Sequence, residues 1–146
     1  MSPQMMGLIV GGLLPALLYG VAGVFAKIST NAGMPVGSHL ICIGLAVSGA
    51  GIALNHLLPG SSPSSTAVLS SGTMGLLWGL GTGLVALGLL KYQAPLAKLV
   101  PLYNMNTLVT VLIALFVFVE WRDVNLVRLM AGAVLVIIGG VLVSSS

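Results

Sequence analysis

The stretch PLAKLVPLYNMNTLVTVL, residues Pro95–Leu112, decides how the fold is interpreted. It holds a lysine, two prolines, a tyrosine and two asparagines within one of the chain's apolar regions. Pro95 suits the start of a helix, because the first backbone N–H groups of a helix have no partner within it. Pro101 lies further inside, where it should kink the helix and free the carbonyl of Ala97. The stretch therefore predicts a kinked membrane helix and not a loop.

Four polar side chains of this helix share one face when residues are spaced at about 100°. They are Tyr103, Asn106, Thr107 and Thr110, whereas Asn104 points about a third of a turn away. One interpretation is hydrogen bonding between helices, which contributes under about 1 kcal/mol per contact. The other is that Tyr103, Asn106 and Thr110 line a polar cavity and bind a small substrate through neutral hydrogen bonds.

The composition of the whole chain excludes most soluble classes of protein. Of 146 residues, 58% are hydrophobic and only 5% are charged, whereas a soluble domain has about a quarter of its residues charged. We therefore expect a lipid bilayer as the solvent. Without a basic run, no nucleic acid is expected as a partner. The single cysteine, Cys42, excludes an intrachain disulfide framework and gives no metal-ligand spacing.

Five apolar runs are long enough to cross a bilayer, which takes about 20 helical residues. Lipid offers no hydrogen-bond partners to the backbone, so the runs should be helices. A polar stretch, residues 59–72, is expected to be the longest connection. The predicted fold is an all-α integral membrane protein forming a single domain over residues 1–146. Its five helices are predicted at about residues 5–26, 36–54, 73–90, 95–119 and 126–143.

The basic residues give almost no preference for one orientation in the membrane. Lys27, Lys91 and Lys98 would lie at one face, and Arg122 and Arg128 at the other. Three against two is a weak bias by the positive-inside rule. We expect the chain to insert in both orientations and to pair with an inverted copy of itself, an arrangement that reproduces an inverted-repeat transporter. The alternative is one orientation set by a paralogous five-helix partner.

Two other runs offer residues that could complete a site. Pro15 lies in the middle of the first run, with Tyr19 one turn later, and Trp78 and Thr82 lie one turn apart in the third. We predict that Tyr19 and Trp78 contact substrate, and that Pro15, like Pro101, breaks helix regularity near the midplane. In the third run, glycines four residues apart favour close helix packing; they are Gly75, Gly79 and Gly83.

The absence of acidic residues from the middle of every run is equally informative. Glu120 and Asp123 flank Arg122 in the turn before the last run. Carboxylates inside a membrane mark proton relays and cation sites, so a proton-driven exporter of lipophilic cations is disfavoured. No pattern indicates a nucleophile with its base, a metal cluster or a phosphate loop. We therefore expect neither an enzyme nor a cofactor.

Two regions carry a resemblance to a known family. The run PLYNMNTLVTVLIALFVFVE followed by MAGAVLVIIGGVLV resembles the end of an EamA-type half of the drug/metabolite transporter superfamily. Such halves close a fourth helix rich in small residues with a glutamate, here Glu120. Their fifth helix is rich in glycine, here Gly132, Gly139 and Gly140. The opening GLLPALLYGVAGVFAK is similar to the superfamily's first helix, with Pro15 and Gly20 in matching places.

The resemblance covers nearly the whole chain and implies a transporter. The family is known for ten-helix proteins, made of two inverted five-helix halves, that move metabolites such as amino acids and sugars. A single half would dimerise and move a small polar metabolite by alternating access, in a bacterial inner membrane. Two departures are Thr107, where a proline is common, and the missing first-helix glutamate of the small multidrug-resistance branch. An accessory subunit, an exporter of that branch, and an interaction protein without a transport path are the alternatives.

Overall fold

All the secondary structure is helical in the computed structural model, which describes residues 2–58, 60–122 and 124–145. Among these residues, five helices are long and apolar enough to cross a membrane, so the predicted number is confirmed. The spans are Met5–Asn31, Val36–Leu57, Ser65–Leu90, Leu96–Val117 and Leu126–Ser145.

The chain divides into two compact units, Met1–Gln93 and Ala94–Ser146. The first unit contains three of the spans and the second contains two. The single domain over residues 1–146 stays a prediction, and each unit is described by itself.

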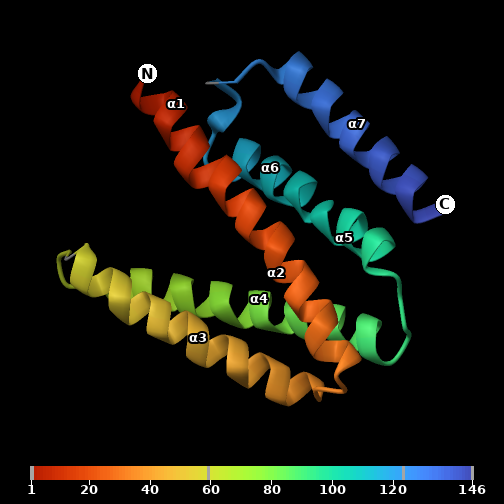
Figure 1. The fold of residues 1–146 in the computed structure, drawn as a ribbon. Helices are drawn as coiled ribbons and strands as arrows, with labels where there is room; N and C mark the ends of the chain where they lie inside the picture. The colour runs from red at the N-terminus through yellow and green to blue at the C-terminus, as the bar shows by residue number, and fades with distance from the viewer. Residues whose placement is uncertain (1, 59, 123, 146) are drawn as a thin grey trace. The chain divides into compact units, whose positions relative to one another are not determined.

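The first span is one continuous rod with an irregular turn in it (Figure 1). It consists of α1 (Pro3–Leu8), the π-helical turn η1 (Ile9–Leu13) and α2 (Leu14–Asn31). The irregular turn ends two residues before Pro15, which has no N–H to donate to the carbonyl of Gly11 and whose ring would press against it. In the π turn, the amide of Leu14 donates instead to the carbonyl of Ile9, five residues back. The helix thus accommodates the proline by a change of hydrogen-bond spacing.

A four-residue turn joins α2 to α3 (Val36–Leu57). Gly33 has a φ of 81°, which a residue without Cβ adopts at no steric cost. Its amide donates to the carbonyl of Thr30, and the amide of Met34 donates to that of Ser29. These two bonds form a Schellman motif, which satisfies carbonyls that the end of α2 would otherwise leave without partners.

The third span, α4 (Ser65–Leu90), begins earlier than the sequence predicted. The prediction of a start near residue 73 was wrong, because residues 65–72 are helical and not part of the connection. The Ser64 hydroxyl accepts a hydrogen bond of 3.2 Å from the amide of Ala67 and caps the helix. The serine and threonine residues near this cap have the composition that is typical of a loop, although they form the start of a helix here.

The other predicted bounds need smaller corrections, since three spans end later than predicted and the fourth ends earlier. The first two spans end at Asn31 and Leu57 instead of residues 26 and 54. In the last turn of α2, the Thr30 hydroxyl donates to the carbonyls of Ala26 and Lys27. These bonds satisfy the hydroxyl, so a polar residue can lie at the end of the helix. The last two spans end at Val117 and Ser145 instead of residues 119 and 143.

Within the first unit, α4 packs against both α2 and α3. Among the glycines of α4, Gly83 lies against α3, because an added Cβ there would be 3.1 Å from Cδ1 of Leu40. At Gly75 and Gly79, by contrast, an added Cβ would meet nothing within 4 Å. Of the three glycines with close-packing spacing, Gly83 is therefore the one at which α3 and α4 meet.

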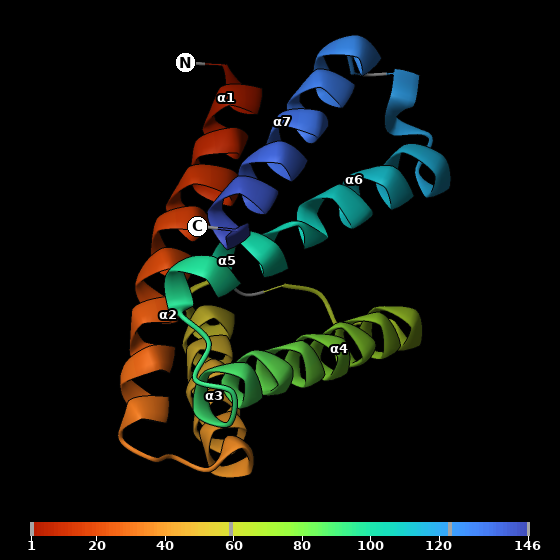
Figure 2. The same ribbon diagram turned by 90° about the vertical axis from the view of Figure 1, so that its right-hand side faces the viewer.

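The second unit is built from α5 (Leu96–Asn104), α6 (Asn106–Val117), the short 3-10 helix η2 (Glu120–Arg122) and α7 (Leu126–Ser145). α6 continues the direction of α5, as Figures 1 and 2 both show. α7 returns along this pair and packs on α5. Where α6 ends, the rings of Phe116 and Trp121 meet edge to face at 6.1 Å between centroids.

Candidate functional site

The fourth span is interrupted at Met105, between α5 and α6. The ψ angle of Met105 is −11°, compared with about −42° in an α-helix. Its amide donates to the carbonyl of Leu102 at 3.2 Å, and its carbonyl accepts from the amide of Leu108 at 3.0 Å. Both bonds join residues three apart, which is the tighter spacing of a 3-10 turn. The interruption lies near the middle of the span Leu96–Val117.

Pro101 is the sequence feature that precedes this interruption. It lies inside α5 and cannot donate a backbone hydrogen bond to the carbonyl of Ala97. The helix continues through Pro101 and loses its regular spacing one turn later, at Met105. A bend of the axis at Pro101 itself stays a prediction, as does a bend at Pro15 in the first span.

A glycine of α7 lies directly against the interruption. A Cβ added to the buried Gly140 would be 3.4 Å from Sδ of Met105 and 3.6 Å from the carbonyl oxygen of Pro101. At Gly132 and Gly139 an added Cβ would meet nothing within 4 Å. An added Cβ would thus be in ordinary van der Waals contact, and Gly140 marks the point at which α7 packs against the irregular backbone of the fourth span.

The polar side chains of the fourth span lie on both sides of Met105. Tyr103 is half-buried on α5, and Asn106 and Thr110 are exposed on α6, one turn apart. The tight turn at Met105 departs from the 3.6-residue spacing on which the predicted common face rests. The stripe is therefore divided into a part on α5 and a part on α6.

Two threonine hydroxyls donate to the backbone beside the interruption. Thr107 donates to the carbonyl of Asn104 at 2.9 Å, and Thr110 donates to that of Asn106 at 3.3 Å. In a regular helix the carbonyl of Asn104 would accept from the amide of Leu108, which donates to Met105 instead. The Thr107 hydroxyl thus replaces the backbone N–H that would otherwise donate to the carbonyl of Asn104. Residue spacing in the sequence did not predict this bond.

The two remaining predicted contact residues, Tyr19 and Trp78, belong to the first unit. Tyr19 is 71% exposed on α2, and Trp78 is 51% exposed on α4. Because Tyr103, Asn106 and Thr110 belong to the second unit, the joining of all five in one site stays a prediction.

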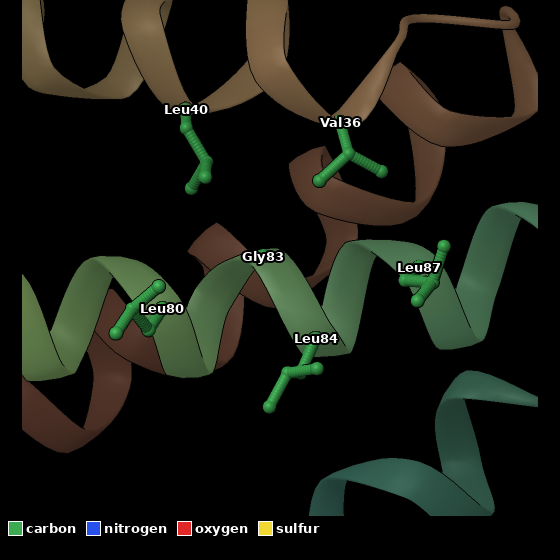
Figure 3. A pocket seen from close by; sticks show the side chains of 6 residues that line it. All are labelled: Val36, Leu40, Leu80, Gly83, Leu84 and Leu87. Atoms are coloured by element: carbon green, nitrogen blue, oxygen red, sulfur yellow. The ribbon is translucent and has the colours of Figure 1, made fainter.

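Trp78 lines one of two neighbouring grooves between α3 and α4. Its groove has a volume of about 280 Å³ and also includes Gly44, Gly75 and Gly79. The second groove is larger, about 450 Å³, and Leu40 borders both. Figure 3 shows the larger groove, with side chains of α3 pointing toward α4. Its lining is entirely apolar: Val36, Leu40, Leu80, Gly83, Leu84 and Leu87.

Within the described ranges, no three histidine, cysteine, aspartate or glutamate side chains are grouped so as to hold a metal ion. Apart from Lys98 near its start, the polar side chains of the fourth span are amides, hydroxyls and a phenol, which form hydrogen bonds without carrying charge. The residues beside Met105 therefore offer neutral hydrogen-bonding groups.

A scan against protein-family models, a search of curated proteins and a search of solved structures each found no match to the chain. The resemblance to an EamA-type half stays a prediction from the sequence.

Proposed function

We propose that the chain is a secondary transporter of a small polar metabolite, such as an amino acid or a sugar, in a bacterial inner membrane. It works as an antiparallel dimer by alternating access and performs no covalent chemistry. The single observation that carries this proposal is the interruption at Met105, near the middle of a membrane span, with Tyr103 and Asn106 beside it.

An interrupted membrane helix is a common way to build a transport site. Helix ends inside the bilayer present backbone N–H and C=O groups, and transporters bind substrates and ions at such ends near the midplane. Here the last turn of α5 and the first turn of α6 meet at Met105. Asn106 adds an amide that both donates and accepts, and Tyr103 adds a hydroxyl. These groups match a polar substrate that needs several neutral hydrogen bonds.

The antiparallel dimer is proposed from the charges at the two ends of the spans. If the spans cross the membrane in alternation, Lys27, Lys91 and Lys98 would fall at one face and Arg122 and Arg128 at the other. By the positive-inside rule, this nearly equal distribution of basic residues gives only a weak preference for one orientation. Two oppositely inserted copies supply ten helices related as in inverted-repeat transporters.

The proposal is tested first by ligand-dependent stability. The protein in lipid nanodiscs is heated with single amino acids and sugars, and a ligand at a hundred times its Kd should add about 2.7 kcal/mol to the free energy of unfolding. Asn106→Leu should abolish the shift, whereas the matched variant Asn104→Leu should keep it. Equal responses of the two variants would remove Asn106 from the site.

A measurement of substrate flux then distinguishes transport from binding without transport. The metabolite that stabilises the protein should cross proteoliposome membranes containing wild-type protein, and not those containing Asn106→Leu. Cross-linking in the same membranes should give a homodimer with C-termini on both faces. A monomer that is inactive without a second gene product would support the accessory-subunit alternative instead.

A further inference from the structure

The two apolar grooves between α3 and α4 adjoin, because Leu40 borders both. Together they form what we call the α3–α4 groove, whose lining on α4 extends from Leu87 to Gly75. These positions are twelve residues apart, which is about 18 Å along an α-helix. One leaflet of a bilayer is half of the hydrocarbon core, or about 15 Å. The α3–α4 groove is therefore long enough to hold one lipid acyl chain.

A positive charge lies at one end of the α3–α4 groove. Gly83, Leu87 and Lys91 follow one another at intervals of four residues and so share one face of α4. The amide of Lys91 donates to the carbonyl of Leu87 at 2.9 Å, so helical spacing holds as far as Lys91. The lysine is exposed just beyond the end of the span at Leu90, and its Nζ lies 5.6 Å from the centroid of the Tyr92 ring. Lysine and tyrosine at the end of a span are typical anchors at a membrane interface.

The first turn of α3 adds to the positive potential at the same end of the groove. Val36 is the first residue of α3 and lines the groove together with Leu87 (Figure 3). Pro35 precedes it and provides no side-chain cap, so the first amides of α3 are open to an anion. The C-terminal end of α4 carries a partial negative charge, which the full charge of Lys91 outweighs. Residues 1–93 contain no aspartate or glutamate, so no acidic side chain of the first unit neutralises this end.

We propose that the α3–α4 groove binds an anionic phospholipid. One acyl chain lies in the groove between Leu87 and Gly75, and the phosphate lies at the end that carries Lys91 and the first turn of α3. The ammonium group supplies a positive charge and three N–H donors, and the N-terminus of a helix is well suited to a phosphate. This binding requires that α3 and α4 span a bilayer and does not depend on the proposed transport.

A second copy of the chain matches the positive end of the groove less well than a phospholipid does. The chain has only two carboxylate side chains, Glu120 and Asp123, and Arg122 lies between them. The turn that contains them therefore offers Lys91 little net negative charge. An anionic phospholipid combines an apolar chain with a negative headgroup, which is the combination that the groove and its positive end favour.

The binding is tested by quenching the fluorescence of Trp78, which lines the groove. The chain has two tryptophans, so in Trp121→Phe all the indole fluorescence comes from Trp78. This variant is reconstituted in phosphatidylcholine bilayers that contain either phosphatidylglycerol or phosphatidylcholine with brominated acyl chains, because bromine quenches indole on contact. Trp78 should prefer brominated phosphatidylglycerol by about five-fold, the effect expected of one lysine near anionic lipid. High salt should reduce this preference, because it screens the charges.

Two pairs of matched variants test whether the lipid binds in the α3–α4 groove. Lys91→Gln should remove the preference, whereas Lys27→Gln, which loses the same charge from α2, should keep most of it. Gly79→Leu places a side chain in the groove and should lower the preference, whereas Gly81→Leu, about half a turn away around α4, should not. An added Cβ meets nothing within 4 Å at either glycine, so we expect both leucine variants to fold.

Native mass spectrometry makes the same comparison in the wild-type chain if Trp121→Phe does not fold. The protein should then retain phosphatidylglycerol in preference to phosphatidylcholine, and Lys91→Gln should not. The proposal is overturned if the two brominated lipids quench Trp78 equally, or if the preference survives Lys91→Gln. It is also overturned if neither lipid quenches Trp78, because protein, such as a second copy of the chain, would then cover the groove.

Discussion

The third and fourth spans are both long and apolar, yet only the fourth is interrupted. α4 runs unbroken from Ser65 to Leu90 although it contains six glycines, whereas the span Leu96–Val117 contains none and breaks at Met105. Glycine lowers helix stability in water by about 1 kcal/mol relative to alanine. The difference between the spans therefore does not follow glycine content.

Proline explains the difference better than glycine does. Glycine keeps its N–H, and in lipid every backbone group must be paired, so a glycine-rich segment stays helical. Proline removes one donor and presses its ring against the preceding turn. Both spans with an internal proline depart from α-helical spacing nearby, at η1 before Pro15 and at Met105 after Pro101.

The largest effect on stability is expected from placing a proline inside α4, which has none. Leu77→Pro removes an N–H from the middle of the unbroken helix and should lower the free energy of unfolding by about 3 kcal/mol or more. Leu77 is exposed, so Leu77→Ala should change stability far less. Chemical unfolding in detergent measures both variants. Equal stability of the two would mean that α4 tolerates a break as readily as the fourth span does.

An intermediate effect is expected from filling the space against the interruption. Gly140→Leu drives a side chain into Met105 and the carbonyl of Pro101, and such overpacking costs about 1–3 kcal/mol. The neighbouring Gly139→Leu meets open space and should change stability by less than about 0.5 kcal/mol. The same unfolding assay compares them, and a larger loss for Gly139→Leu would show that α7 does not pack on Met105 through Gly140.

The smallest effect should distinguish two threonines that make the same kind of bond. Thr107→Val removes the hydroxyl donor from the carbonyl of Asn104 beside the break and should cost about 1 kcal/mol. Thr82 donates to the carbonyl of Trp78 within the regular helix α4, where a backbone donor remains, so Thr82→Val should cost almost nothing. Equal losses in a thermal scan would show that the carbonyl of Asn104 has no special need of the hydroxyl.

The number of spans could be predicted from sequence because hydropathy over about 20 residues is a direct requirement of the bilayer. The start of α4 could not, because Ser64 and the residues after it have the composition of a loop while forming a capped helix. Hydropathy also missed the ends of the first two spans, since the helices continue past Lys27 and Asn55, the polar residues at which the apolar runs stop.

The candidate site could be predicted only in part. The sequence placed an irregularity in the fourth span, but it predicted neither its position at Met105 nor the packing of Gly140 against it. The gathering of Tyr19 and Trp78 with Tyr103 depends on how the two units meet and stays a prediction.

The Schellman turn at Gly33 bears on how the chain acquires its topology. Its hydrogen bonds at Gly33 and Met34 reach back only to Thr30 and Ser29, so the reversal after α2 needs no other element. The turn therefore fixes the direction of α3 relative to α2, whichever way α2 crosses the bilayer. Along the sequence, Lys27 is the only full charge within ten residues of this turn, so local charge gives the hairpin little preference for one orientation in the membrane. Such a turn is compatible with the predicted insertion of the chain in both orientations.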